Sequence, residues 1–182
     1  EKYTIYIRLA RCLSRNSGTF RWLETAYPDC NIDCIAPGGT IDLTEMRKEM
    51  EKKLNEQNPL IVANSYGCFL ASFFQDQQAV WVNPCLYPYF TLPQIADLSD
   101  ADMEMLRMQE GMRDSLYDGN HIADVLPVIS DADELIPDHL EYEFTDKKPI
   151  IVPGGHHKLT DAQRAIYLKK ESTYNCNKDS FY

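Results

Sequence analysis

The sequence lacks any apolar run approaching the roughly 20 residues that a membrane-spanning helix needs. It also lacks an excess of basic residues, because 18 lysines and arginines stand against 28 aspartates and glutamates, a formal net charge of −10. Nucleic-acid binding depends on a basic face that neutralises phosphates, and adsorption to anionic lipid has the same requirement. The composition therefore predicts a protein that binds neither nucleic acid nor membrane.

Cysteine pairs of the C-x-x-C type are missing as well. The histidines are not at metal-ligand spacing from the cysteines, so the sequence predicts no metal site and no cofactor. Scattered thiols are typical of a reducing compartment, and the segment 3–7 is typical of a strand rather than a signal peptide, which together predict a cytoplasmic protein. The six cysteines are Cys12, Cys30, Cys34, Cys68, Cys85 and Cys176.

Strand-like and helix-like segments alternate along the 182 residues. Such alternation predicts βαβ units, and hence an α/β domain with a parallel sheet and helices on both faces. We expect one domain over 1–170 and a polar tail over 171–182. A segment rich in proline and tyrosine, 85–98, is expected to be an irregular loop. Strands are expected at 3–7, 32–36, 60–63, 79–82, 124–129 and 149–152, and helices at 20–27, 43–54, 68–74, 101–115 and 159–169.

A serine lies between a buried strand and a helix. Residues 63–67 have the sequence ANSYG, which is close to the G-x-S-x-G pattern of a nucleophile elbow, with Ala63 in place of the first glycine. The turn in such an elbow is so tight that the residues two before and two after the serine must be small. Ser65 is therefore the candidate nucleophile. The alternative is that Ser65 caps the following helix, a common use of serine.

An acidic segment and a histidine segment follow two later strands. The first is SDADELIP at 130–137, and the second is PGGHHKL at 153–159. Because the carboxyl ends of parallel strands share one sheet edge, both segments are expected near Ser65. The chain order serine, acid, histidine is that of the α/β-hydrolases, in which the acid orients the histidine and the histidine activates the serine.

With these motifs the chain resembles a known family. It is similar, up to about residue 168, to the small bacterial α/β-hydrolases of the YqiA-like esterase group. That resemblance implies a three-layer α/β-hydrolase fold with a mostly parallel central sheet and minimal or no lid. The matching segments are IYI at 5–7, ANSYG at 63–67, VNP at 82–84, DADELIP at 131–137 and GGHHKL at 154–159.

The resemblance also implies which of the neighbouring residues are catalytic. In the family the acid precedes a short hydrophobic step, which implies Asp133 rather than Asp131. The family histidine follows G-G-x, which implies His157 rather than His156, although the neighbour stays open. The implied catalytic triad is Ser65, Asp133 and His157.

The segment after the first strand departs from the family. Family members usually carry His-Gly there, whereas this chain has Arg8 and Leu9. The resemblance implies that the backbone N–H groups of Tyr66 and Ala10 form the oxyanion hole. Without the glycine the loop has fewer allowed backbone angles, and a misplaced donor would cost about 3 kcal/mol of transition-state stabilisation.

Three residues are candidates for contact with the substrate. Arg8 and Arg11 concentrate positive charge beside the expected site, where a guanidinium could bind a carboxylate or phosphate. They are alternatively solvated loop charges. Tyr87 follows the strand 79–82 and could line an acyl or aryl pocket, or equally anchor a packed loop.

The function expected from the sequence is hydrolysis of a small acyl ester or thioester by a serine hydrolase. Amide hydrolysis uses the same triad and is not separable from it by sequence. The alternative, prompted by Arg8 and Leu9 at the oxyanion loop, is a weakly active or inactive hydrolase-fold protein that binds an anionic ligand or a protein partner.

Overall fold

The computed structural model describes residues 18–35, 40–56, 59–117, 121–136 and 141–168, together with the backbone of 4–8. The expected tail over 171–182 lies outside the described residues. The elements are β1 (Thr4–Arg8), α1 (Gly18–Ala26), β2 (Asn31–Cys34), α2 (Thr44–Glu56), β3 (Leu60–Asn64), α3 (Tyr66–Ala71), β4 (Ala79–Val82), α4 (Pro88–Thr91), η1 (Leu92–Gln94), α5 (Asp100–Asp114), β5 (Val125–Ser130), η3 (Tyr142–Phe144), β6 (Ile150–Val152) and α6 (Asp161–Tyr167).

The six described strands form one sheet in the order β2-β1-β3-β4-β5-β6. Every neighbouring pair is parallel, so the predicted parallel sheet is confirmed. β1 is next to the edge strand β2, and the later strands β3 to β6 follow in order on the other side of β1. All the carboxyl ends consequently lie at one edge, where the connections to the next elements begin.

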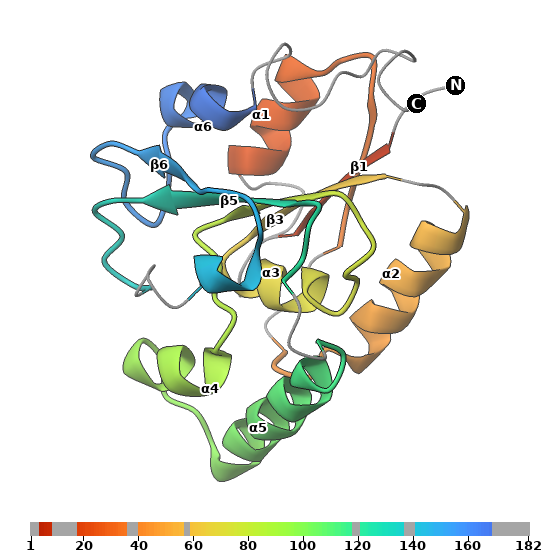
Figure 1. The fold of residues 1–182 in the computed structure, drawn as a ribbon, viewed down its shortest axis with the longest axis vertical. Helices are drawn as coiled ribbons and strands as arrows, with labels where there is room; N and C mark the ends of the chain where they lie inside the picture. Colours follow the sequence, from red (N-terminus) through yellow and green to blue (C-terminus); the bar gives the residue numbers. More distant parts are fainter. Residues whose placement is uncertain are drawn as a thin grey trace.

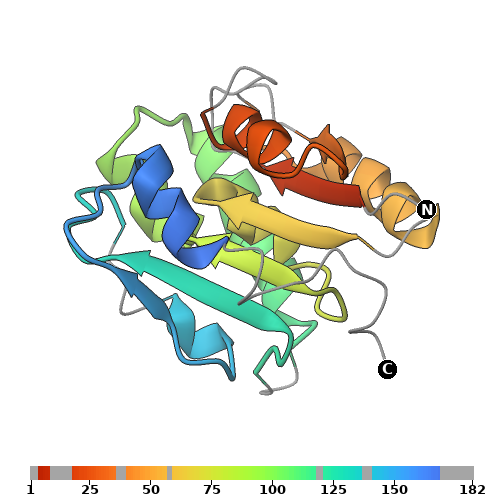
Figure 2. The same ribbon diagram turned by 90° about the horizontal axis from the view of Figure 1, so that it is seen from above.

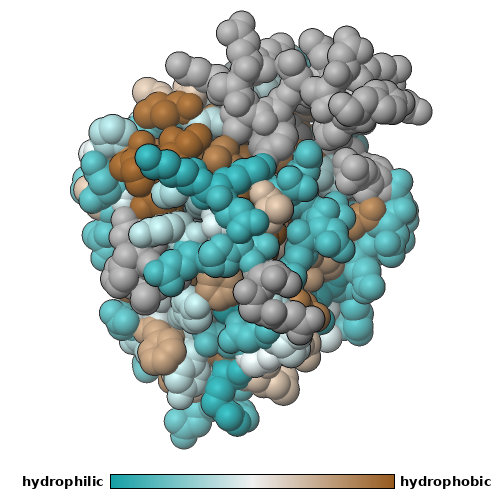
Figure 3. Space-filling model, in the orientation of Figure 1, coloured by the Kyte–Doolittle hydropathy of each residue, from teal (hydrophilic) through white to brown (hydrophobic). Residues whose placement is uncertain are grey.

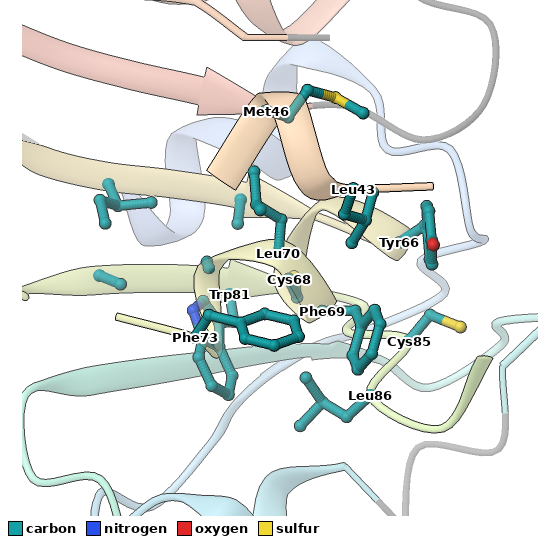
Figure 4. Close-up of a cluster of buried hydrophobic side chains, with 14 of the residues drawn as sticks. Leu43, Met46, Tyr66, Cys68, Phe69, Leu70, Phe73, Trp81, Cys85 and Leu86 are labelled. Carbon is teal, nitrogen blue, oxygen red and sulfur yellow. The ribbon is translucent and has the colours of Figure 1, made fainter. Parts of the chain in front are cut away.

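Helices cover both faces of the sheet (Figures 1 and 2). The helices α1 and α6 lie on one face, whereas α2 and α3 lie on the other with α4 and α5 beyond them. Successive side chains of a strand point to opposite faces of the sheet and therefore enter two different cores. On β4, Val80 and Val82 pack under α1 and α6, whereas Ala79 and Trp81 face α3. The core on the α3 side is the larger and includes stacked aromatic rings of Tyr66 and Phe69 (Figure 4).

The prediction of an irregular loop over 85–98 is partly wrong. This segment contains α4 and η1, and its continuation is the 15-residue helix α5. Pro88 is at the start of α4, where its missing N–H leaves no unsatisfied donor, so the prolines that suggested a loop instead begin a helix. All the expected strands and helices are present, with ends shifted by at most three residues.

A buried arginine binds the helical connection between β4 and β5, which contains α4, η1 and α5, to the core. Arg113 on α5 is 0% exposed, donates to the carbonyl of Leu86 at 2.9 Å and to Ser72 Oγ at 3.3 Å, and contacts the partly exposed Asp114. Its guanidinium also lies 4.8 Å from the ring centre of Phe144. The rings of Phe69, Tyr87 and Tyr117 complete the surrounding aromatic cage. A fully desolvated cation with these partners joins α5 to α3 and to the loop between β4 and α4.

The surface is mostly hydrophilic, as the coloured part of one face shows in Figure 3. The exposed large apolar side chains include Phe90 on α4 and a stripe of Met108, Met112 and Leu116 along and just after α5. None of the described helices combines the length and the apolar character needed to cross a bilayer.

The first prediction concerns Arg113. Replacing it with alanine leaves the Leu86 carbonyl and the aromatic cage without their shared partner, and we expect the free energy of unfolding to fall by about 3–5 kcal/mol. Urea denaturation measures this. Arg107→Ala is the matched control on the same helix, because its ion pair with Glu104 is exposed and should contribute less than about 1 kcal/mol. Equal losses from both variants would contradict the role given to Arg113.

Candidate active site

Ser65 lies on a strained turn between β3 and α3. Its φ of 53° and ψ of −127° lie in a region that residues with side chains rarely adopt. Its N–H donates to the carbonyl of Val82 at 2.9 Å, and its own carbonyl accepts from Cys85 N–H at 3.1 Å, so both sides of the turn are tied to β4 and the loop beyond it. The hydroxyl makes no capping bond to α3, which removes the helix-cap alternative. This is the geometry of a nucleophile elbow.

Asp133 and His157 meet above the ends of β5 and β6. His157 Nδ1 lies 3.0 Å from Asp133 Oδ2 and 3.2 Å from Oδ1, and the two side chains are 15% and 4% exposed. Asp133 Oδ1 also accepts the backbone N–H groups of Leu135 and Ile136 at 2.8 and 3.2 Å. The carboxylate is therefore held by its own turn and can orient the imidazole, with Nε2 left as the ring atom for proton transfer.

The neighbouring acidic residues hold the backbone of the histidine loop. Asp131 Oδ1 accepts the N–H of Gly154 at 2.7 Å, and the carbonyl of Gly155 accepts from Ala132 N–H at 3.0 Å. Glu134 Oε2 accepts the N–H of His157 at 3.1 Å. The pKa of the Glu134 carboxyl is lowered mainly because it accepts this hydrogen bond, so Glu134 is ionised at neutral pH. The acidic loop over 131–134 is thus joined to the segment 154–157 by several hydrogen bonds.

The alternatives left open by the sequence occupy different positions. Asp131 contacts a backbone amide and not an imidazole among the described residues. His156 faces Glu134, with Nδ1 3.3 Å from Oε2, and its side chain is 69% exposed. The contact between an imidazole and a buried carboxylate is made by His157 and Asp133.

Ser65 and His157 are held near one sheet edge by the strands between them. Within the described part of the chain, no hydrogen bond joins the Ser65 hydroxyl to an imidazole. Catalytic hydrogen bonds are often long in the absence of substrate and shorten when it binds. The structure therefore brings Asp133 and His157 into direct contact, and it places Ser65 at the same edge of the sheet without a described hydrogen bond to them.

Asn83 contacts the candidate site, and the sequence interpretation did not single it out. It follows β4, has a φ of 45° and is 2% exposed. Its Oδ1 accepts from Ser130 N–H at 2.8 Å, and its Nδ2 donates to Ser130 Oγ at 2.9 Å and to the carbonyl of His157 at 3.3 Å. The signal in the sequence was the Asn-Pro pair at 83–84, which we used as part of a segment that matches the resembled family, without assigning Asn83 a role.

The remaining predicted site residues differ in what the structure describes. Tyr66 begins α3, and its hydroxyl donates to the carbonyl of Ile41 at 2.8 Å, which turns the side chain into the core while its backbone follows Ser65 (Figure 4). Arg8 ends β1, paired in register with Ala63, so its backbone lies at the same edge. Ala10 and Arg11 lie outside the described residues.

The ring of Tyr87 packs against Phe144, with centroids 5.4 Å apart, and against Arg113. Burial raises the pKa of its hydroxyl, which is therefore neutral at pH 7. These are the contacts of a packed loop, and the expected contact of Tyr87 with substrate stays a prediction.

The buried cysteines near the site are poor nucleophiles. Cys85, whose N–H contacts the Ser65 carbonyl, is 0% exposed, and burial raises the pKa of its thiol, as does the nearby Glu141. Burial likewise raises the pKa of Cys68. Since the thiolate is the reactive form, these two thiols are inert at neutral pH. No group of metal-ligating side chains suited to an ion occurs among the described residues.

Comparison with known proteins yields structural similarity alone. No family model and no curated protein matches the chain, so the narrower YqiA-like resemblance is not confirmed. One similar solved structure is Est1E from Butyrivibrio proteoclasticus with ferulic acid bound, at 12% sequence identity and a TM-score of 0.66, which covers 91% of this chain and 84% of that chain.

Two further structures have the same architecture. A monoacylglycerol lipase from Paleococcus ferrophilus is 13% identical, with a TM-score of 0.60 over 90% of this chain and 91% of that chain. YbtT, a type II thioesterase from the yersiniabactin NRPS/PKS pathway, is 11% identical, with a TM-score of 0.54 over 86% of this chain and 85% of that chain. The chain therefore has an α/β-hydrolase-like fold, and it shares that fold with esterases, lipases and thioesterases.

Proposed function

We propose that this protein is a serine hydrolase that cleaves a small acyl ester or thioester. The observation that carries the proposal is the strained backbone of Ser65 at the end of β3, together with the contact of His157 with a buried Asp133 at the same edge of the sheet. A capping serine needs no positive φ, and a loop histidine needs no buried carboxylate.

In the first half of the reaction, Ser65 Oγ attacks the acyl carbon while His157 Nε2 takes the hydroxyl proton. The Asp133 carboxylate, in contact with Nδ1, keeps the ring in the required tautomer and stabilises the imidazolium that forms. The negative charge moves to the former carbonyl oxygen. The backbone N–H groups of Tyr66 and Ala10 are the proposed donors to that oxygen.

In the second half, the imidazolium gives its proton to the departing alcohol or thiol, and an acyl-serine remains. Water then attacks the acyl carbon as His157 takes one of its protons, and the proton returns to Ser65 Oγ when the acid leaves. The net change is ester plus water to acid plus alcohol, or thioester plus water to acid plus thiol. The enzyme groups return to their starting states, and no cofactor takes part.

A small-molecule substrate is supported by the fold's known members. Est1E binds ferulic acid, and YbtT is a type II thioesterase. For this chain, Arg8 and Arg11 remain the proposed partners of a negatively charged group on the substrate, and Tyr87 the proposed wall of its pocket.

A second candidate function is binding of an anionic ligand without appreciable turnover. It is favoured by Arg8 at the end of β1 and by the lack, among the described residues, of a bond between the Ser65 hydroxyl and His157. An active-site-directed fluorophosphonate separates the two candidates. Folded protein that stays unlabelled at Ser65 would support the binding function over hydrolysis.

The second prediction is that Ser65→Ala abolishes hydrolysis of p-nitrophenyl acetate and butyrate. The loss in kcat should be about 10⁴-fold or more, because the variant has no group that can form the acyl-enzyme. The exposed Ser115, just after α5, supplies the control Ser115→Ala, which should keep the wild-type rate. Equal rates from wild type and Ser65→Ala would remove the proposal.

The third prediction concerns the acid. Asp133→Asn keeps an oxygen for the Leu135 and Ile136 N–H groups but no longer favours the required imidazole tautomer, so kcat should fall about 10³–10⁴-fold. Asp131→Asn is the matched control, because Asp131 contacts only the Gly154 amide among the described residues. We expect it to change kcat less than about tenfold. The opposite ranking would assign the acid to Asp131.

The fourth prediction separates the adjacent histidines. His157→Gln should lose the same activity as Ser65→Ala, because no other imidazole contacts Asp133 among the described residues. The exposed His156 lies outside the proposed relay, so His156→Gln should retain at least about a third of the wild-type kcat. Steady-state kinetics on p-nitrophenyl butyrate measure both. Loss of activity in His156→Gln with retention in His157→Gln would overturn the choice.

A further inference from the structure

Asn83 occupies a junction between three parts of the site. Its backbone N–H donates to the carbonyl of Val128 at 2.8 Å, which continues the pairing of β4 with β5. It lies directly after Val82, whose carbonyl accepts from Ser65 N–H. Its side chain reaches the loop that carries His157. One residue thus contacts β5 and the histidine loop from a position next to the nucleophile turn.

The orientation of the Asn83 amide follows from its partners. The N–H of Ser130 can only donate, so the atom that faces it at 2.8 Å is Oδ1. Nδ2 therefore points to the opposite side, toward three acceptors: Ser130 Oγ at 2.9 Å, the carbonyl of His157 at 3.3 Å and that of His156 at 3.4 Å. A side chain of this length, with an acceptor on one branch and a donor on the other, meets all four of these partners.

The space around this junction is tightly filled. A Cβ added to Gly155 would lie 2.9 Å from Ser130 Oγ, 3.0 Å from the carbonyl oxygen of Val152 and 3.0 Å from Leu159 Cδ2. The histidine loop therefore passes directly against the hydroxyl that Asn83 also contacts. A shift of Ser130 or Asn83 would be transmitted to the backbone that carries His157.

The backbone of Asn83 also has an unusual conformation. Its φ of 45° lies in the left-handed region, which asparagine tolerates better than most residues. Together with Ser65 it makes two positive-φ side-chain-bearing residues at the ends of adjacent strands. Such strain persists where surrounding bonds hold it, and here those bonds lead to the candidate catalytic groups.

We propose that Asn83 is a positioning residue that holds the His157 loop in register with Ser65 through its Nδ2 contacts to the carbonyls of His156 and His157. The inference rests on the proposed function, in which His157 must transfer a proton to and from Ser65. Glu134 holds the N–H of His157 from the other side. The His157 peptide is thereby fixed at both its N–H and its carbonyl, and the ring keeps its contact with Asp133.

The test uses two variants that act differently on the junction. Asn83→Asp keeps the size, the tolerance of positive φ and the acceptor for Ser130 N–H, but it presents an oxygen to the two carbonyls. Asn83→Gly relieves the backbone strain and removes every side-chain contact. For both we expect kcat to fall about 10–100-fold with KM changed less than about twofold, because misplacement of a reacting group by 1 Å costs about that much.

The position of the imidazole is measured separately from turnover. The chain has four histidines, so the ring ¹H–¹³C signal of His157 is assignable by its loss in His157→Gln. In Asn83→Asp and Asn83→Gly this signal should move toward that of the exposed His156, while the thermal midpoint stays within a few degrees of wild type. Asn55→Asp, at an exposed position on α2, is the control for the added charge and should leave the signal and kcat unchanged.

The outcomes distinguish this inference from the proposed function. If the His157 signal does not move in either variant, the role of Asn83 is overturned. The same conclusion follows if kcat, calculated per fluorophosphonate-labelled active site, stays within twofold of the wild-type value. If wild-type protein neither hydrolyses esters nor labels at Ser65, the proposed hydrolase function fails. The ring signal then decides the role of Asn83 alone: displacement supports its hold on the His157 loop, and an unmoved signal refutes it.

Discussion

The parallel direction of neighbouring strands is the constraint on which the site depends. Because β3, β4, β5 and β6 all run the same way, the residues that follow them emerge at one edge. Ser65, Asn83, the acidic loop and the histidine loop are separated by up to 92 positions in the sequence, yet each is placed by a strand end. An antiparallel strand at any of these positions would send its loop to the opposite edge.

The same strand pairing holds two residues at that edge in strained backbone conformations. Ser65 and Asn83 each hold a backbone conformation that costs about 1–3 kcal/mol. Ser65 N–H bonds to the end of β4, and Asn83 N–H bonds to β5, so each strained residue is held by the next strand. These hydrogen bonds across the sheet offset part of the local cost.

The strands could be predicted because they are short apolar runs that end at turn residues, as expected for strands buried on both faces. Most helices could be predicted because their buried apolar residues recur every three or four positions. Ser65 could be proposed from its motif and from the order serine, acid, histidine. The choice of Asp133 over Asp131 and of His157 over His156 depended on the family resemblance. The role of Asn83 could not be predicted, since its contacts to Ser130 and His157 join residues 47 and 74 positions away. Neither local propensity nor spacing reports such pairings. The helix α4 was missed for a different reason: proline, here Pro88, favours both loops and first helical turns.

The cage around Arg113 links the stability of the helical connection to the geometry of the site. The Leu86 carbonyl that accepts from Arg113 belongs to the residue directly after Cys85, and Cys85 N–H bonds to Ser65. Asn83 begins the same short loop. A buried guanidinium that fixes Leu86 therefore also limits how far the chain between Asn83 and Leu86 can move, because four consecutive residues are held at both ends. A change in the packing of α5 against α3 would consequently also shift the turn that carries Ser65. This holds although α5 itself contributes no residue to the proposed reaction.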